Sequence, residues 1–122
     1  MSAAYGVTIT GVGHHLPATF EDNEALCRRL PVTPEWILQK TGIKRRYIAA
    51  ANEAASDYAT VAARRALVMA GVEADQVDLI IGCTFSGDYI FPSLSAKVQG
   101  NLSPSISLAG TLRVSAAAGL GA

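Results

Sequence analysis

The run Val77–Thr84, which reads VDLIIGCT, constrains the fold of this chain more than any other feature. It is short and almost continuously apolar, as is typical of a β-strand that is covered on both faces. A long alanine-rich helix is predicted before it, from a cap at Ser56 to about Ala70, with Gly71 as its stop. A second buried strand is predicted over Val7–Gly13, where β-branched and small residues alternate. Strand, helix and strand together predict a right-handed βαβ unit in a mostly parallel sheet, and therefore an α/β fold.

The predicted long helix is apolar on most of its sides, so we expect it to be buried between layers. Arg64 and Arg65 mark the side that must reach water or an acidic group. Residues 85–90 then form a loop at the carboxyl end of the strand, where open α/β sheets bind their ligands. The remaining predicted elements are a helix capped by Ser93 and running through Leu102, a third strand over Ser105–Leu108 and the start of a helix over Val114–Ala122.

Composition excludes several classes of function. The chain has 122 residues, enough for one small domain or part of a larger one. Ten basic and ten acidic residues cancel, so no global field attracts nucleic acid or an anionic membrane surface. Cys27 and Cys83 are too few for a disulfide framework or a metal site, which indicates a reducing compartment. Neither a secretory signal nor an apolar run long enough to span a membrane is recognisable, so we expect a soluble cytoplasmic protein.

The glycines Gly11 and Gly13 invite comparison with a dinucleotide-binding loop. Leu16 stands where the third glycine of that motif belongs, and Pro17 prevents the helix that must follow. The pattern is better explained by a strand that ends in a tight turn. His14 and His15 are interpreted as ordinary loop residues, because adjacent side chains in extended backbone point in opposite directions and make poor joint metal ligands.

A short helix with a cluster of cations follows. Thr33 is a good cap, Pro34 suits the first position, and Gly42 is a plausible stop. This helix carries Trp36, and the cations on or just beyond it are Lys40, Lys44, Arg45 and Arg46. An aromatic face beside positive charge suits a ligand with a stacking ring and phosphates, such as a nucleotide or coenzyme A. The alternative is a tryptophan that fills the core beside a solvated basic loop.

Two elements flank this helix. Before it, Asn23 is predicted to cap a helix from Glu24 to Leu30, which Pro31 ends. After it, the segment Ile43–Ala49 is predicted to be extended.

Several motifs in this order resemble the N-terminal region of beta-ketoacyl-acyl-carrier-protein synthase III, in the thiolase superfamily. The likeness runs from about residue 7 to about residue 102, and residues 103–122 diverge. Its anchors are Gly11-x-Gly13-x-x-Leu16-Pro17, Asn23, Glu35-Trp36, Thr41-Gly42-Ile43, Arg46, Asp78-Leu79-Ile80 and Phe91-Pro92-Ser93. The resemblance implies that residues 1–122 form an incomplete N-terminal half of a thiolase-like αβαβα fold, with a mostly parallel sheet.

The resemblance also implies roles for single residues. Trp36 matches the tryptophan that stacks on the adenine of coenzyme A, and Thr41 matches a threonine beside it. Lys40 stands where the family often has an arginine that contacts the nucleotide, and Lys44 occupies a second basic position of the same entrance. Phe91 matches a phenylalanine that reaches across the dimer and closes the partner's acyl pocket; the alternative for Phe91 is a purely packing role.

The resemblance implies a fatty-acid or polyketide acyltransferase that joins acyl-CoA to malonyl-acyl carrier protein by decarboxylative condensation. Coenzyme A thioesters are its substrates, and no separate cofactor is expected. The implied partners are acyl carrier protein and a second copy of the chain or a complementary chain.

The family's nucleophile is a cysteine at a buried helix N-terminus, where the helix dipole lowers the thiol pKa. No cysteine follows Cys83. An ungapped match places Ala116 at the nucleophile position, a shift of one residue places Ser115 there, and a shift of four places Leu112. Only Ser115 could attack an acyl group, and its base would have to be one of the chain's two histidines. The family's catalytic His and Asn belong to a second half that the sequence does not reach, so we expect the chain as given to be inactive.

Three hypotheses follow from this pattern. The chain is a truncated or frame-disrupted piece of a condensing enzyme, a non-catalytic half that a separate chain completes, or a small stand-alone module that binds coenzyme A or a nucleotide. Two or three parallel strands need a further sheet edge and a cover on the other face. Alone, the chain is therefore expected to expose an apolar patch and to aggregate or dimerise.

Overall fold

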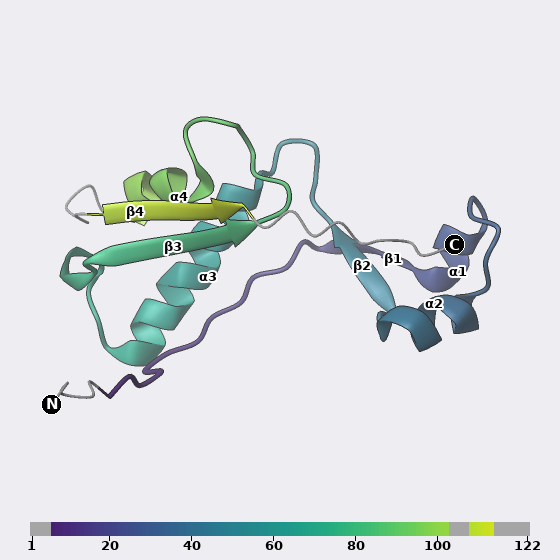
Figure 1. Cartoon of the computed structure of the whole chain (residues 1–122), viewed down its shortest axis with the longest axis horizontal. Coiled ribbons are helices and arrows are strands. Elements are labelled where there is room, and N and C mark those ends of the chain that lie inside the picture. Colours follow the sequence, from purple (N-terminus) through teal and green to yellow (C-terminus); the bar gives the residue numbers. More distant parts are fainter. Residues whose placement is uncertain (1–5, 103–107, 114–122) are drawn as a thin grey trace, which may run out of the picture. The chain divides into compact units, whose positions relative to one another are not determined.

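A computed structural model of the chain describes residues 6–102 and the backbone of residues 108–113 (Figure 1). The chain divides into two compact units. The first, called the sheet unit, comprises residues 1–15 and 54–122, and the second, called the tryptophan unit, is Leu16–Glu53. Each unit is considered separately below.

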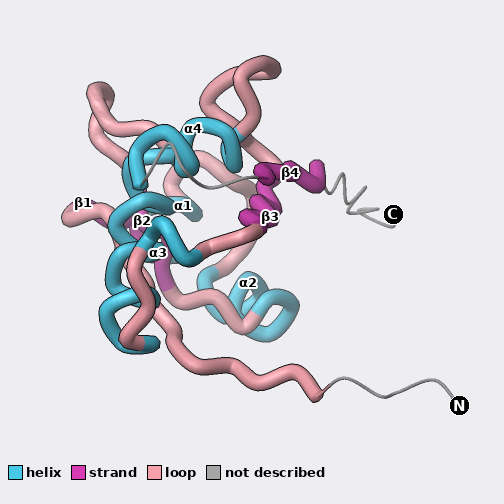
Figure 2. The backbone as a smooth tube through the Cα atoms, turned by 90° about the vertical axis from the view of Figure 1, so that its left-hand side faces the viewer, coloured by secondary structure: helices cyan, strands magenta, loops and turns pink. Residues whose placement is uncertain are grey.

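The sheet unit is built around a parallel pair of strands. Strand β3 (Leu79–Thr84) pairs with β4 (Leu108–Arg113), in a register that sets Leu79 opposite Leu108 and Thr84 opposite Arg113. Helix α4 (Leu94–Leu102) forms the crossover between them, as parallel strands require (Figures 1 and 2). The predicted α/β class is confirmed. The predicted βαβ unit of residues 7–13, 56–70 and 77–84 is not formed in the described residues, and β3 instead pairs in parallel with β4. The third strand was predicted over Ser105–Leu108, whereas the described strand β4 runs from Leu108 to Arg113. The helix expected over residues 114–122 lies outside the described residues.

Helix α3 (Ala55–Ala70) crosses this unit and ends, as predicted, at Gly71, which adopts the left-handed conformation with φ of 65°. Its start differs from the prediction. Ala54 is the N-cap residue and Ser56 lies inside the first turn, where it is buried. The carboxylate of Asp57 accepts a hydrogen bond from the Ala54 backbone N–H at 2.9 Å. A short 3₁₀ turn, η1 (Ala74–Gln76), leads from α3 to β3.

The strand predicted over Val7–Gly13 is not formed: the segment pairs with neither β3 nor β4 in the described residues. It is extended and runs along α3 (Figure 1). A Cβ atom on Gly13 would lie 2.6 Å from the Ala66 backbone nitrogen and would also clash with the Ala62 carbonyl oxygen. The glycines therefore let the segment pack its backbone directly on a helix of small side chains. Arg65 fixes it further by donating a hydrogen bond to the His14 carbonyl oxygen at 2.7 Å.

The tryptophan unit contains an antiparallel pair of strands, and only the second of them was predicted from the sequence. Strand β1 (Thr19–Asp22) pairs with β2 (Arg45–Ile48), with Thr19 opposite Ile48 and Asp22 opposite Arg45. The extended segment predicted after Ile43 corresponds to β2. Helix α1 (Asn23–Cys27) starts at an Asp22 cap, whose Oδ1 accepts from the Ala25 N–H at 2.8 Å. The prediction of an Asn23 cap is wrong by one residue, and the helix is shorter than predicted.

Helix α2 (Pro34–Thr41) forms as its sequence predicts. Thr33 is the N-cap, and its Oγ1 accepts a hydrogen bond from the Trp36 N–H at 3.2 Å. Gly42 ends the helix in the left-handed conformation with φ of 70°, and its N–H donates to the Leu38 carbonyl oxygen at 2.8 Å. Both ends are set by local residues, which explains why this helix could be predicted with correct bounds.

The described residues leave several large apolar side chains uncovered. Strand β3 alternates between half-buried and exposed residues, with Ile81 67% exposed, so the expectation of cover on both faces is wrong for this chain. The same holds for α3, where Val68 is 83% exposed. The fully buried side chains of the sheet unit include Ser56, Ser95 and Val98. Within the part of the chain that the structure describes, no helix is long and apolar enough to cross a membrane.

Candidate functional site

Trp36 and Lys40 lie one turn apart on α2, so their side chains share one face of that helix. Trp36 is 45% exposed, whereas its neighbour Ile37 is buried and supplies the apolar contact to the core. The alternative in which the tryptophan fills the core is therefore wrong. Lys40 is exposed in the last turn and makes no hydrogen bond or ion pair within the described residues. This face presents an accessible aromatic ring beside a cation that forms no ion pair with any group the structure describes.

The hydroxyl of Thr41 is used to close the helix. Its Oγ1 donates to the Ile37 carbonyl oxygen at 2.7 Å and accepts from the Ile43 N–H at 3.1 Å. The first bond ties the side chain to the carbonyl group one turn earlier, and the second holds the N–H of the residue after Gly42. Thr41 thus shapes the turn after α2, which is a structural contribution that its sequence position did not reveal.

The four cations of the predicted cluster divide into two kinds. The Arg45 guanidinium lies 4.9 Å from the centre of the Phe20 ring, and Arg46 Nη1 donates to Asn23 Oδ1 at 3.0 Å. These two arginines therefore stabilise the unit itself. Lys40 and Lys44 are exposed and have no such partner among the described residues, so the positive charge available to a ligand is that of the two lysines.

Asn23 is the buried polar group that holds this region together. It is only 5% exposed, and its Nδ2 donates to the Ile43 carbonyl oxygen at 2.9 Å while its Oδ1 accepts from Arg46. One amide thereby joins α1, the turn after α2 and β2. Sequence reasoning assigned Asn23 to a helix cap and missed this contact, because nothing local distinguishes an amide that caps from one that bridges.

Lys44 lies in a different setting from the Trp36 face. It lines a shallow depression of about 280 Å³ together with Asn23, Glu24, Pro34, Glu35 and Leu38. Neither Trp36 nor Lys40 lines this depression. Two carboxylates share it with the lysine, and their negative charge opposes an incoming phosphate. The structure thus brings Trp36 and Lys40 together and sets Lys44 in surroundings that are less favourable for anions.

The loop of residues 85–91 follows the carboxyl end of β3, as predicted. Phe91 is 88% exposed, and Phe85, Tyr89 and Ile90 are also exposed. Phe91 therefore does not pack against the described part of its own chain, and the purely packing alternative is wrong within it. Strand β4 runs parallel to β3, so the polypeptide leaves both strands at the same edge of the sheet.

Asp88 in this loop is a functional candidate that the sequence analysis did not recognise. Its carboxylate accepts from the Ala55 N–H at 2.6 Å and from the Ser56 N–H at 3.1 Å, at the first turn of α3. Burial raises the pKa of this carboxyl, but the hydrogen bonds from Ser56 and Ala55 and the charge of Lys97 outweigh it and hold the pKa below 3.8, its ordinary value. The residue could be found only from the fold, since Ser56 is more than thirty positions away in sequence.

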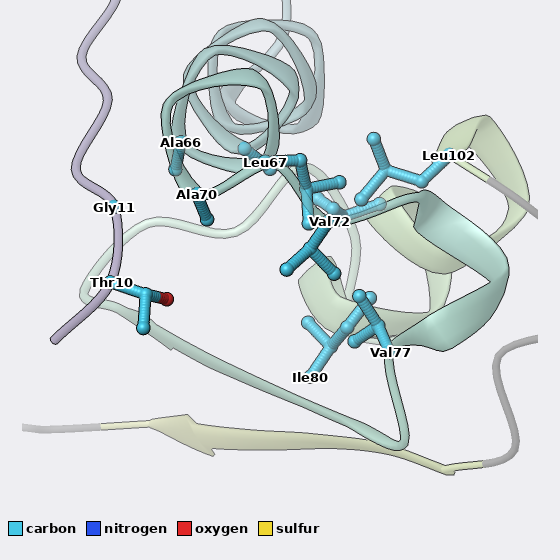
Figure 3. Close-up of a pocket in the computed structure, with 11 residues that line it drawn as sticks. Thr10, Gly11, Ala66, Leu67, Ala70, Val72, Val77, Ile80 and Leu102 are labelled. Carbon is cyan, nitrogen blue, oxygen red and sulfur yellow. The ribbon is translucent and has the colours of Figure 1, made fainter. Parts of the chain in front are cut away.

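A cavity of about 290 Å³ lies between the N-terminal segment, α3, β3 and α4 (Figure 3). The side chains that converge on it are almost all aliphatic, among them Leu67, Val77 and Ile80. It contains no acid, base or nucleophile other than the hydroxyl of Thr10. The cavity is therefore a feature of packing and offers no catalytic chemistry.

The remaining predicted residues offer little further chemistry. Ser115 and Ala116 lie outside the described residues, and Leu112 lies in β4 opposite Cys83. His15 packs on Tyr58 with ring centres 5.3 Å apart, and the carbonyl group of His14 is held by Arg65. No group of three His, Cys, Asp or Glu residues that could hold a metal ion occurs within the described ranges.

Comparison with known proteins gives these features a context. No family model matches the chain. Over 94 residues it is 49% identical to the beta-ketoacyl-[acyl-carrier-protein] synthase III of Rhodospirillum centenum, an alignment that covers 77% of this chain and 29% of that protein. The chain is homologous to the N-terminal part of beta-ketoacyl-[acyl-carrier-protein] synthase III.

Solved structures agree with this relationship. The synthase III of Aquifex aeolicus superposes with a TM-score of 0.80 at 35% identity, covering 89% of this chain and 35% of that one. The priming beta-ketosynthase of the R1128 polyketide pathway superposes with a TM-score of 0.75 at 31% identity, covering 87% of this chain and 32% of that one. The predicted thiolase-like α/β fold is thereby confirmed, and the chain spans about a third or less of the synthases III it matches.

Proposed function

We propose that this chain supplies the nucleotide-binding part of a synthase III-type condensing enzyme, with the Trp36 and Lys40 face of α2 as its contact with coenzyme A. The observation that supports the proposal is the exposed indole one helical turn from a lysine that has no ion-pair partner among the residues the structure describes. The reaction proposed for the complete enzyme is the decarboxylative condensation of an acyl-CoA with malonyl-acyl carrier protein.

The chemistry of the ligand fits this face. An adenine ring stacks on an indole at a gain of about 1–3 kcal/mol, and an ammonium group attracts phosphate as a point charge. Lys40 lacks the planar fork with which an arginine would grip two phosphate oxygens. We therefore propose a contact that depends more on stacking than on the basic residue. Thr41 and Lys44 are proposed to contribute less, since the Thr41 hydroxyl closes the helix and Lys44 shares its depression with carboxylates.

Titration with coenzyme A tests the proposal directly, because Trp36 is the chain's single tryptophan and reports on its own surroundings. We expect saturable quenching of its emission by coenzyme A and none by pantetheine, which lacks the nucleotide. Lys40→Ala should weaken binding about fivefold, equivalent to ~1 kcal/mol. Gln39→Ala, on the same helix, is the matched control and should leave the affinity unchanged. Quenching that pantetheine reproduces, or a Lys40→Ala affinity equal to that of the parent chain, would contradict the assignment.

The polypeptide of residues 1–122 is proposed not to carry out the acyl-transfer step by itself. No cysteine follows Cys83. The ungapped match places Ala116 at the nucleophile position, and Ser115, which a shift of one residue places there, is the only candidate with a hydroxyl. Incubation with a radiolabelled acyl-CoA should therefore leave no label on the protein after denaturation, and mass spectrometry should show Ser115 unmodified. A stable acyl ester on Ser115 that is absent from Ser115→Ala would overturn this expectation.

We also propose that a second polypeptide, either another copy or a complementary chain, covers the apolar groups that this chain leaves exposed. Support comes from Ile81 on β3, Val68 on α3 and Phe91 on the loop, which a monomer would present to water. Acyl carrier protein is the proposed partner of the complete enzyme, because the relatives are named for their use of it.

A further inference from the structure

Helix α3 begins without a capping side chain from its own N-cap residue, Ala54. Its first backbone N–H groups therefore need acceptors from elsewhere. Asp57 satisfies the Ala54 N–H, and Asp88 satisfies the next two, those of Ala55 and Ser56. One of the two carboxylates belongs to the helix, and the other belongs to the loop between β3 and α4. The start of α3 is thus completed by a residue of the loop of residues 85–91.

The surroundings of Asp88 favour its charged form. The N-terminal end of a helix carries partial positive charge, and Lys97 on α4 adds a full positive charge nearby. Lys97 also lies 5.9 Å from the centre of the Tyr89 ring. The opposing charge at this helix end is that of Asp57, and His15 of the N-terminal segment contacts Tyr58 in the first turn. Asp88 is half-buried, so solvent screens these interactions only partly.

We propose that Asp88 is a positioning residue that latches the loop of residues 85–91 to the first turn of α3, through its hydrogen bonds to the Ala55 and Ser56 N–H groups. The two residues that end this loop, Ile90 and Phe91, are both 88% exposed. The place of Phe91 at the sheet edge therefore depends on a carboxylate three residues before it. The inference does not depend on coenzyme A binding at Trp36.

Amide hydrogen exchange, followed residue by residue by NMR on the whole chain, tests the latch. In Asp88→Ala, exchange at Ala55 and Ser56 should accelerate at least tenfold, and the amides of residues 87–91 should accelerate with them. Asp88→Asn keeps one acceptor oxygen but loses the charge, so it should show an intermediate effect. In the unsubstituted chain, the pKa of Asp88 is lowered, so the latch is complete at neutral pH. It should be lost as the pH falls below 3.8, which a fall in the protection factors of the Ala55 and Ser56 amides, relative to their intrinsic exchange rates at each pH, would report.

Asp57→Ala is the matched control, because it removes a carboxylate from the same helix end without touching the loop. It should accelerate exchange at Ala54 and leave residues 87–91 unchanged. Two results would overturn the proposal: loop amides that exchange at the parent rate in Asp88→Ala, or loop amides that accelerate equally in Asp57→Ala. If Asp88→Ala does not fold, the exchange rates of the amides of residues 87–91 are compared between Asp88→Asn and Asp57→Ala. Faster exchange in Asp88→Asn alone supports the latch, and equal rates in the two variants overturn it.

Discussion

Replacing Gly13 with alanine should destabilise the sheet unit by about 1–3 kcal/mol, because the added methyl group has no space. A Cβ atom there would lie 2.6 Å from the Ala66 backbone nitrogen and against the Ala62 carbonyl oxygen. Both are backbone atoms of α3, so the strain can be relieved only by moving the N-terminal segment away from the helix. That movement would also stretch the hydrogen bond from Arg65 to the His14 carbonyl oxygen.

Far-UV circular dichroism during thermal unfolding measures this effect, since most of the helix in the chain belongs to α3 and α4 of the sheet unit. Gly100→Ala is the matched control. Gly100 lies within α4 with nothing within 4 Å of its added Cβ, so that substitution should stabilise the unit by about 0.5–1 kcal/mol. Equal midpoints for Gly13→Ala and the parent chain would show that the segment does not pack on α3.

Replacing Asn23 with leucine should cost the tryptophan unit about 1–3 kcal/mol, or more because one of the partners is charged. The substitution keeps the branched shape and the number of heavy atoms of the side chain but leaves the Ile43 carbonyl oxygen and the Arg46 guanidinium without their buried partner. Asn23→Asp should be less severe, since a carboxylate can still accept from Arg46 although it cannot donate to Ile43.

Urea unfolding followed by the emission of Trp36 reports on this unit, because the single tryptophan lies in α2. The transition midpoint should fall most for Asn23→Leu and less for Asn23→Asp. Asn52→Ala, at an exposed position of the same unit, should leave it unchanged. An Asn23→Leu midpoint that matches Asn52→Ala would mean that the bridging amide contributes nothing to stability.

Elements whose ends are decided by neighbouring residues could be predicted from the sequence. Helix α2 is bounded by Thr33 and Gly42, and its cap, first turn and stop all lie within ten residues. Elements that depend on distant partners could not be predicted. The segment before Gly13 has the composition of a strand, yet strand pairing requires an adjacent edge, and the segment packs on α3 instead. Strand β1 has a weak pattern of its own and is defined by its pairing with β2.

The candidate site shows the same division. Trp36 and Lys40 could be placed on one face because helical spacing alone decides it. The separation of Lys44 could not be foreseen, since it results from the turn at Gly42 and from the carboxylates of Glu24 and Glu35, which only the fold brings near. Asp88 could not be found at all, because its hydrogen bonds join a loop to the first turn of a helix, to residues that lie 33 and 32 positions earlier in the sequence.

The parallel pairing of β3 with β4 has a consequence for the order of events during synthesis on the ribosome. Strand β3 cannot pair with β4 until the whole of α4 and the strand after it have emerged. At translation rates of about 5–20 residues per second, the edge of β3 stays open to other nascent chains for a second or more. Slow codons over α4 would lengthen that exposure, and a bound chaperone would shield it.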